Sequence, residues 1–84
     1  MENDSEKFLF DLLSTPSPTG FEAPGQRKWA AYTRAFADAV ESDAYGNVWA
    51  TVRGTDPKAP VLMLEAHADE IGYIVRHITD DGFL

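Results

Sequence analysis

A continuous apolar run, Val61 to Leu64, constrains the fold of this chain more than any other feature of its sequence. Four consecutive apolar residues leave no polar face for water, so we predict a strand that is covered on both faces. The chain has 84 residues and therefore room for one domain at most. It contains no cysteine, so neither disulfides nor a thiolate metal site can strengthen its small core.

Helix signals precede this run. Capping residues at positions 3–5 and an apolar face of Phe8, Leu9, Leu12 and Leu13 predict a first amphipathic helix. It ends near Ser14, because two prolines and a glycine follow in residues 14–20. Pro24 suits the start of a second helix, and helical spacing extends it to about Val40. The same periods assign three aromatic residues to the core or a partly buried surface: Trp29, Phe36 and Trp49.

Strand signals follow the second helix. Residues 41–44 form a short extended stretch, residues 45–47 a turn, and Val48 to Arg53 a half-buried strand with alternating polarity. Residues 71–78 predict a further strand, and Thr79 to Gly82 carry a hairpin signal with two residues in the return strand. We therefore predict an α/β fold, with two N-terminal helices followed by strands, that is incomplete as a domain.

Charge and hydropathy exclude several kinds of partner. The formal charge of −7 would repel a phosphate backbone, so we expect no nucleic-acid partner. The N-terminus is acidic and polar, unlike a secretory signal, and the apolar runs are far shorter than the roughly 20 residues that span a bilayer. We expect a cytoplasmic protein with no membrane partner.

A cluster of one imidazole and three carboxylates, residues 65–70, comes directly after the apolar run. In an extended chain, residues two apart point to the same side, so His67 and Asp69 would face one site. A metal-bound histidine usually donates its second ring N–H to a carboxylate, which is the role that Asp69 would fill. Open α/β sheets also place ligand sites beyond the carboxyl ends of their strands.

A plainer interpretation stays open, because an isolated His-x-Asp pattern is more often part of a solvated loop than of a metal site. On parity, Glu70 is solvated rather than catalytic, and His77 is an ordinary residue of a strand face. The sequence contains no phosphate-binding glycine loop, no Gly-x-Ser-x-Gly motif and no thiol nucleophile. Hydrolysis by an activated water is the chemistry that remains.

Three stretches in the same order, residues 12–22, 43–48 and 61–84, resemble the glutamyl-aminopeptidase and tetrahedral-aminopeptidase family of co-catalytic metallopeptidases, peptidase family forty-two. The resemblance implies two divalent ions, zinc or cobalt, with His67 as the first metal ligand and Asp69 as the catalytic-site aspartate that orients it. The family's other ligands and its general base would lie beyond Leu84. Residues 1–70 would be the N-terminal part of the catalytic domain, with a zinc-peptidase-type mixed sheet. Residues 71–84 would begin an inserted β domain used for dimerisation, on the way to shells of up to twelve subunits.

The resemblance therefore predicts the N-terminal part of an aminopeptidase that acts on peptide substrates. A different class of function is a non-catalytic fragment or pseudoenzyme that acts by association. A third is glycoside hydrolysis, which normally needs two carboxylates about 5–9.5 Å apart across the glycosidic bond. Asp69 and Glu70 are adjacent and of opposite parity, which disfavours that reaction.

Overall fold

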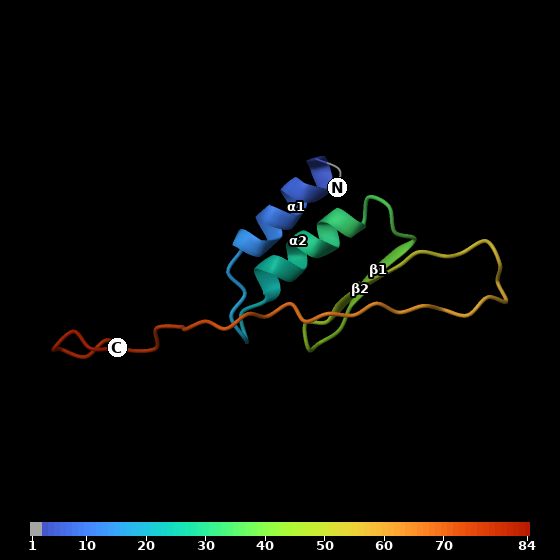
Figure 1. Ribbon diagram of the computed structural model, residues 1–84. Coiled ribbons are helices and arrows are strands. Elements are labelled where there is room, and N and C mark those ends of the chain that lie inside the picture. The colour runs from blue at the N-terminus through green and yellow to red at the C-terminus, as the bar shows by residue number, and fades with distance from the viewer. Residues whose placement is uncertain (1–2) are drawn as a thin grey trace.

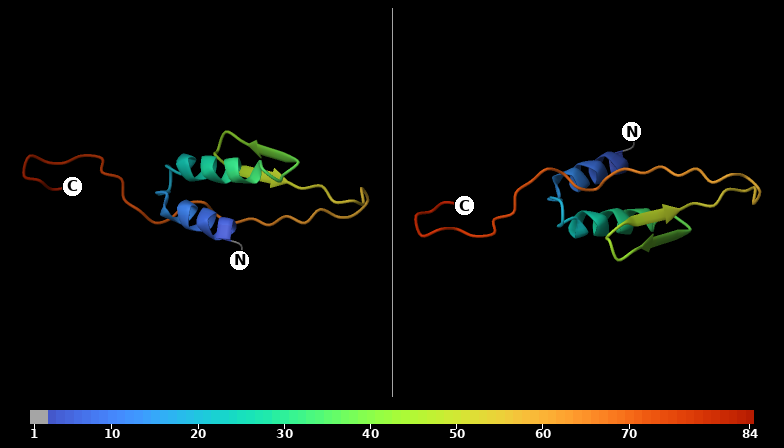
Figure 2. Two further views of the ribbon diagram at one scale, coloured as in Figure 1. Left: turned by 90° about the horizontal axis from the view of Figure 1, so that it is seen from above. Right: turned by 90° about the horizontal axis from the view of Figure 1, so that it is seen from below.

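The computed structural model describes residues 3–84, and its regular elements all lie before residue 52. They are helix α1 (Asn3–Ser14), helix α2 (Ala23–Thr33), strand β1 (Ala39–Ser42) and strand β2 (Val48–Thr51). Helix α2 lies between α1 and the β1–β2 hairpin, and the chain after β2 runs out, folds back and passes the loop that joins the helices (Figures 1 and 2). The two helices and the antiparallel sheet agree with the predicted α/β class.

The two helices pack through one aromatic pair. Phe8 of α1 stacks on Tyr32 of α2 with ring centroids 3.8 Å apart and planes 6° from parallel, a contact worth about 0.5–1.5 kcal/mol beyond the area it buries. The hydroxyls of Ser5 and Tyr32 lie 3.3 Å apart beside it. The predicted first helix is confirmed, including its end at Ser14. Its packed face is narrower than expected, because Leu13 stays largely exposed.

The second helix ends earlier than its period predicted. It stops at Thr33, whose hydroxyl donates to the carbonyl oxygens of Trp29 and Ala30 at 3.0 and 3.2 Å. Val40 instead lies in β1 opposite Ala50. Its pairing with β2, rather than its helical spacing from the residues of α2, determines its backbone conformation. Phe36 is 60% exposed and packs edge-on against Tyr32, so of the two predicted locations, core or partly buried surface, the core is wrong.

Strands β1 and β2 form an antiparallel hairpin in which Val40 faces Ala50 and Glu41 faces Trp49. Val48 and Ala50 are half-buried and Trp49 is more exposed, as predicted for a strand with one covered face. The Trp49 indole donates to Glu41 Oε2 at 3.0 Å. The predicted turn is present, with Gly46 at a φ of 86° that other residues rarely adopt.

Asp43 holds this turn, and replacing it with alanine should destabilise the hairpin. Its carboxylate accepts from Asn47 Nδ2 at 2.8 Å, Tyr45 N at 2.9 Å and Asn47 N at 3.0 Å. The Asn47 side chain, followed by these backbone donors, holds the pKa of Asp43 below 3.8. This contribution is therefore present above pH 3.8 and is lost as the pH falls through the lower pKa of the folded state.

The Trp49 indole N–H signal, followed by NMR through an acid titration, measures that loss. The expected result is a weaker hairpin in Asp43→Ala at neutral pH and a smaller acid response. Asp80→Ala, a change in the distant Thr79–Gly82 turn, serves as the matched control. Equal hairpin stability in the two variants would contradict the prediction.

The two apolar segments after β2 are not strands, which corrects the sequence prediction. Leu62 is 83% exposed and Ile71 is 98% exposed, and neither segment joins a sheet. Among residues 61–78, the one backbone pairing with the rest of the described chain is an isolated parallel bridge between Pro18 and Glu70. A strand needs a hydrogen-bonded neighbour, and no other segment of the described chain provides one. The turn at residues 79–82 is present, with a 2.9 Å bond from Gly82 N to Thr79 O.

The core is small. Among residues 3–84, Ala30 is the one buried hydrophobic residue. Three polar residues are also buried: Thr15, Ser17 and Thr33. So little apolar burial gives a small free energy of folding. Of the helices in this part of the chain, neither has the length and apolar character needed to cross a membrane.

Candidate metal-ligand site

The His67 segment is anchored where it crosses the loop between α1 and α2. Glu70 N donates to Ser17 O at 2.8 Å, and Ser17 N donates to the Glu70 carboxylate at 3.4 Å. Gly72 then passes close to Pro18, since a Cβ on Gly72 would lie 3.0 Å from that proline's Cβ. These contacts fix the backbone of residues 69–72 against the loop.

His67 and Asp69 form the pair that parity predicted. His67 Nδ1 lies 2.8 Å from the carbonyl oxygen of Asp69 and 3.0 Å from its Oδ1. Two oxygen acceptors at Nδ1 assign the ring proton to that nitrogen, which leaves the lone pair on Nε2. The side chain of His67 is 84% exposed and that of Asp69 39%. Nε2 is thus free to bind a metal from the solvent side.

Thr19 completes the hydrogen-bond network, and sequence reasoning did not identify it. Its hydroxyl donates to Asp69 Oδ2 at 2.7 Å, so each carboxylate oxygen of Asp69 has a partner. Fifty residues separate the two side chains, and no local periodicity connects them. The available signal was the resemblance of residues 12–22 to a metallopeptidase family, which includes this threonine.

The electrostatics of the pair follow from these bonds. The Asp69 carbonyl, and then the Asp69 carboxylate, raise the pKa of His67 above 6.5. The Thr19 hydroxyl, and then His67, lower the pKa of Asp69 below 3.8. Asp69 is therefore ionised at neutral pH and acts as an acceptor toward both neighbours.

The donor set fits one ligand of a metal centre. Residues 3–84 contain no group of three or more His, Cys, Asp or Glu side chains that could hold a metal ion. Glu70 is engaged with Ser17 N, and His77 is exposed with no hydrogen bond among the described residues. His67 is the histidine whose ring is oriented by a carboxylate, as metal-binding histidines are.

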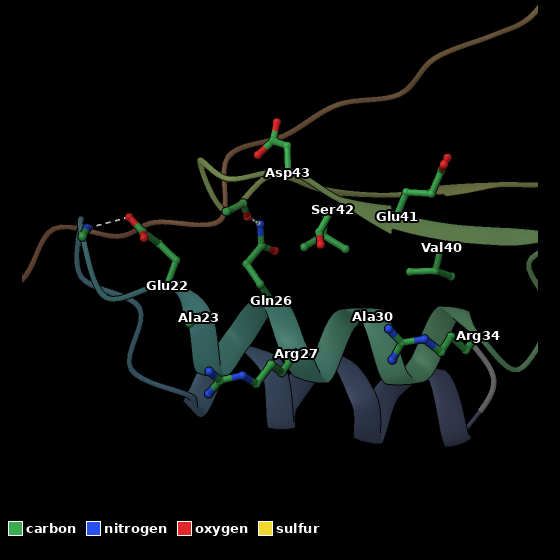
Figure 3. Close-up of a pocket in the computed structure, with 13 residues that line it drawn as sticks. Glu22, Ala23, Gln26, Arg27, Ala30, Arg34, Val40, Glu41, Ser42 and Asp43 are labelled. Carbon is green, nitrogen blue, oxygen red and sulfur yellow. Dashed lines mark hydrogen bonds between the residues drawn. The ribbon is translucent and has the colours of Figure 1, made fainter.

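A groove of about 360 Å³ between α2 and β1 is separate from this site. Figure 3 shows Val40 above Ala30 in the groove, with Arg27 on α2, Arg34 just after its end, and the Asp43 carboxylate pointing away. Neither His67 nor Asp69 lines it. The groove thus does not contribute to the His67 site.

Comparison with known proteins shows sequence similarity between this chain and aminopeptidases. Residues 46–84 match the sequence model of the M42 glutamyl aminopeptidase family. The chain is 38% identical to the lysyl aminopeptidase of Pyrococcus furiosus over 74 residues, 87% of this chain and 20% of that protein. It is 32% identical to the glutamyl aminopeptidase of Lactococcus lactis subsp. cremoris over 79 residues, 94% of this chain and 21% of that protein. No solved structure matches the chain.

The chain therefore belongs to the M42 glutamyl aminopeptidase family, as its resemblance predicted. It spans about a fifth of the length of the curated relatives it matches.

Proposed function

We propose that this chain supplies one metal ligand and its orienting carboxylate to a di-metal aminopeptidase that removes N-terminal residues from peptides. The observation that carries the proposal is the His67–Asp69 pair, in which Nδ1 is engaged and Nε2 is free. The similarity of this chain to lysyl and glutamyl aminopeptidases supports the removal of N-terminal residues as the reaction.

In this proposal His67 binds zinc or cobalt through Nε2, and Asp69 holds the ring in the required tautomer. The metal pair, when bound, supplies Lewis-acid polarisation of the scissile carbonyl and an activated water. The described residues account for one ligand, so the remaining ligands and the general base come from outside this set.

The finer architecture belongs to the same proposal. Residues 1–70 contribute to a catalytic domain with a zinc-peptidase-type mixed sheet, and residues 71–84 begin an inserted β domain that mediates assembly from dimers to dodecamers in the cytoplasm. The exposed apolar segments at residues 61–64 and 71–78 support this view, because such residues normally lie under covering layers.

A second candidate is a non-catalytic chain that acts by association. The observation that favours it is the lack of a complete ligand set among residues 3–84. The two proposals differ in whether this segment supports metal-dependent turnover when the rest of a family enzyme is supplied.

A chimera makes that distinction. Residues 1–84 replace the matching segment of the Pyrococcus furiosus lysyl aminopeptidase, and hydrolysis of lysyl anilide is followed. We expect turnover that a chelator abolishes and that added zinc or cobalt restores. Circular dichroism before and after chelation checks that the fold is unchanged. Chelator-resistant turnover would contradict the proposal, and a folded but inactive chimera would favour the non-catalytic alternative.

A further inference from the structure

We propose that Thr19 is a positioning residue, whose hydroxyl holds the Asp69 carboxylate so that His67 keeps its Nε2 nitrogen unprotonated. The inference rests on the proposed function for its significance, because an unprotonated Nε2 is what a metal requires. The hydrogen bonds themselves are independent of any metal.

The first step is the geometry of the carboxylate. Thr19 Oγ1 donates to Asp69 Oδ2 at 2.7 Å, while His67 Nδ1 lies 3.0 Å from Oδ1. A 2.7 Å bond from a hydroxyl to an ionised carboxylate belongs to the strong, charge-assisted class. With one oxygen held by Thr19, the carboxylate is not free to rotate, and the other oxygen stays directed at the imidazole.

The second step is the rigidity of the segment that carries Thr19. Phe21 N donates to Pro18 O at 2.8 Å across a turn in which Gly20 has a φ of 92°, and Pro16 and Pro18 fix their own φ angles. Ser17 in the same loop is buried. Thr19 is thus held on a constrained turn, although its own side chain is exposed.

The third step distinguishes the contribution of the Thr19 hydroxyl from that of the backbone contacts between the loop and the His67 segment. The bonds between Ser17 and Glu70 fix where the backbone of the His67 segment crosses the loop. They do not fix the side-chain torsion of Asp69, which is the angle that determines what Oδ1 faces. Within residues 3–84, Thr19 provides the one side-chain donor to Oδ2.

The test uses the metal-free 84-residue chain with ¹⁵N-labelled histidine at alkaline pH, where the imidazoles are neutral. Two-bond ¹H–¹⁵N NMR spectra report which ring nitrogen carries the proton, and His77 serves as the reference in the same spectrum. We expect His67 to be the Nδ1–H tautomer in the wild type and in Thr19→Ser, which retains the hydroxyl. In Thr19→Val and Thr19→Ala we expect a smaller Nδ1–H fraction at His67, although it stays above that of His77 because the Asp69 carbonyl oxygen, 2.8 Å from Nδ1, remains an acceptor.

An unchanged Nδ1–H fraction in Thr19→Val and Thr19→Ala would overturn the proposal, because the Asp69 carbonyl oxygen would then fix the tautomer without the carboxylate that Thr19 holds. Loss of the preference in Thr19→Ser as well would assign it to the loop backbone instead. The Trp49 indole signal reports the fold, and its loss in both Val and Ala variants would show a structural role and also overturn the proposal. Failure of the metal-dependent turnover would leave the tautomer result standing, so the two inferences fail separately.

Discussion

Replacing His67 with alanine in the chimera is expected to lower kcat/KM for aminoacyl anilides by more than about 100-fold. Loss of a partner that merely orients a ligand typically costs 10–100-fold in metal affinity or activity, and loss of the ligand itself costs more. Alanine removes the Nε2 lone pair that the Asp69 contacts leave free. The variant should also bind less zinc at equilibrium, which metal analysis after dialysis measures.

The change should leave the fold intact, because the His67 side chain is 84% exposed and packs against no core residue. His77→Ala is the matched control, since it removes an exposed imidazole of the same segment that forms no hydrogen bond with residues 3–84. The control chimera is expected to keep its activity and metal content. Equal activity in the His67 and His77 variants would remove His67 from the site.

The parts of the fold that sequence predicted are those that local interactions determine. Helix α1 (Asn3–Ser14) stops before two prolines, and the hairpin turn contains a glycine at positive φ. The His67–Asp69 contact is local as well, because two residues of an extended segment share a side. Each of these features depends on neighbours within a few positions.

The failures involve partners that are distant in sequence. Val40 fits both a helical spacing and a strand, and its pairing with Ala50 decides between them. The apolar run at residues 61–64 has the composition of a buried strand, but burial needs layers that the described chain does not place over it. The Thr19–Asp69 bond joins residues 50 apart, so no period or spacing could indicate it.

Replacing Asp69 with asparagine is expected to lower kcat/KM of the chimera by about 10–100-fold, the usual effect of removing a partner that orients a metal ligand. Asparagine keeps the shape and one acceptor oxygen but removes the negative charge. The pKa of His67 should then fall toward 6.5 without reaching it, because the Asp69 backbone carbonyl, the largest cause of the increase, remains.

The pH dependence follows from the direction of that shift. A raised pKa means that the folded chain favours the charged imidazole, so this contribution to stability is fully present below pH 6.5 and is lost as the pH rises through the folded pKa. A metal needs the neutral ring, so protons compete with it over the same range. In Asp69→Asn the pH range over which protons compete with the metal for His67 should move to lower pH. The metal affinity at high pH should decrease, because the His67 imidazole becomes less basic.

Proton NMR titration of the two histidines measures this separation, with His77 as the internal reference. Zinc affinity determined at several pH values gives the second readout. An unchanged His67 pKa together with unchanged activity would show that the carboxylate orients nothing. A lowered pKa with full activity would show that the contact is real but that the metal site does not depend on it. A lowered His67 pKa together with reduced activity in Asp69→Asn would establish Asp69 as the partner that orients the metal ligand.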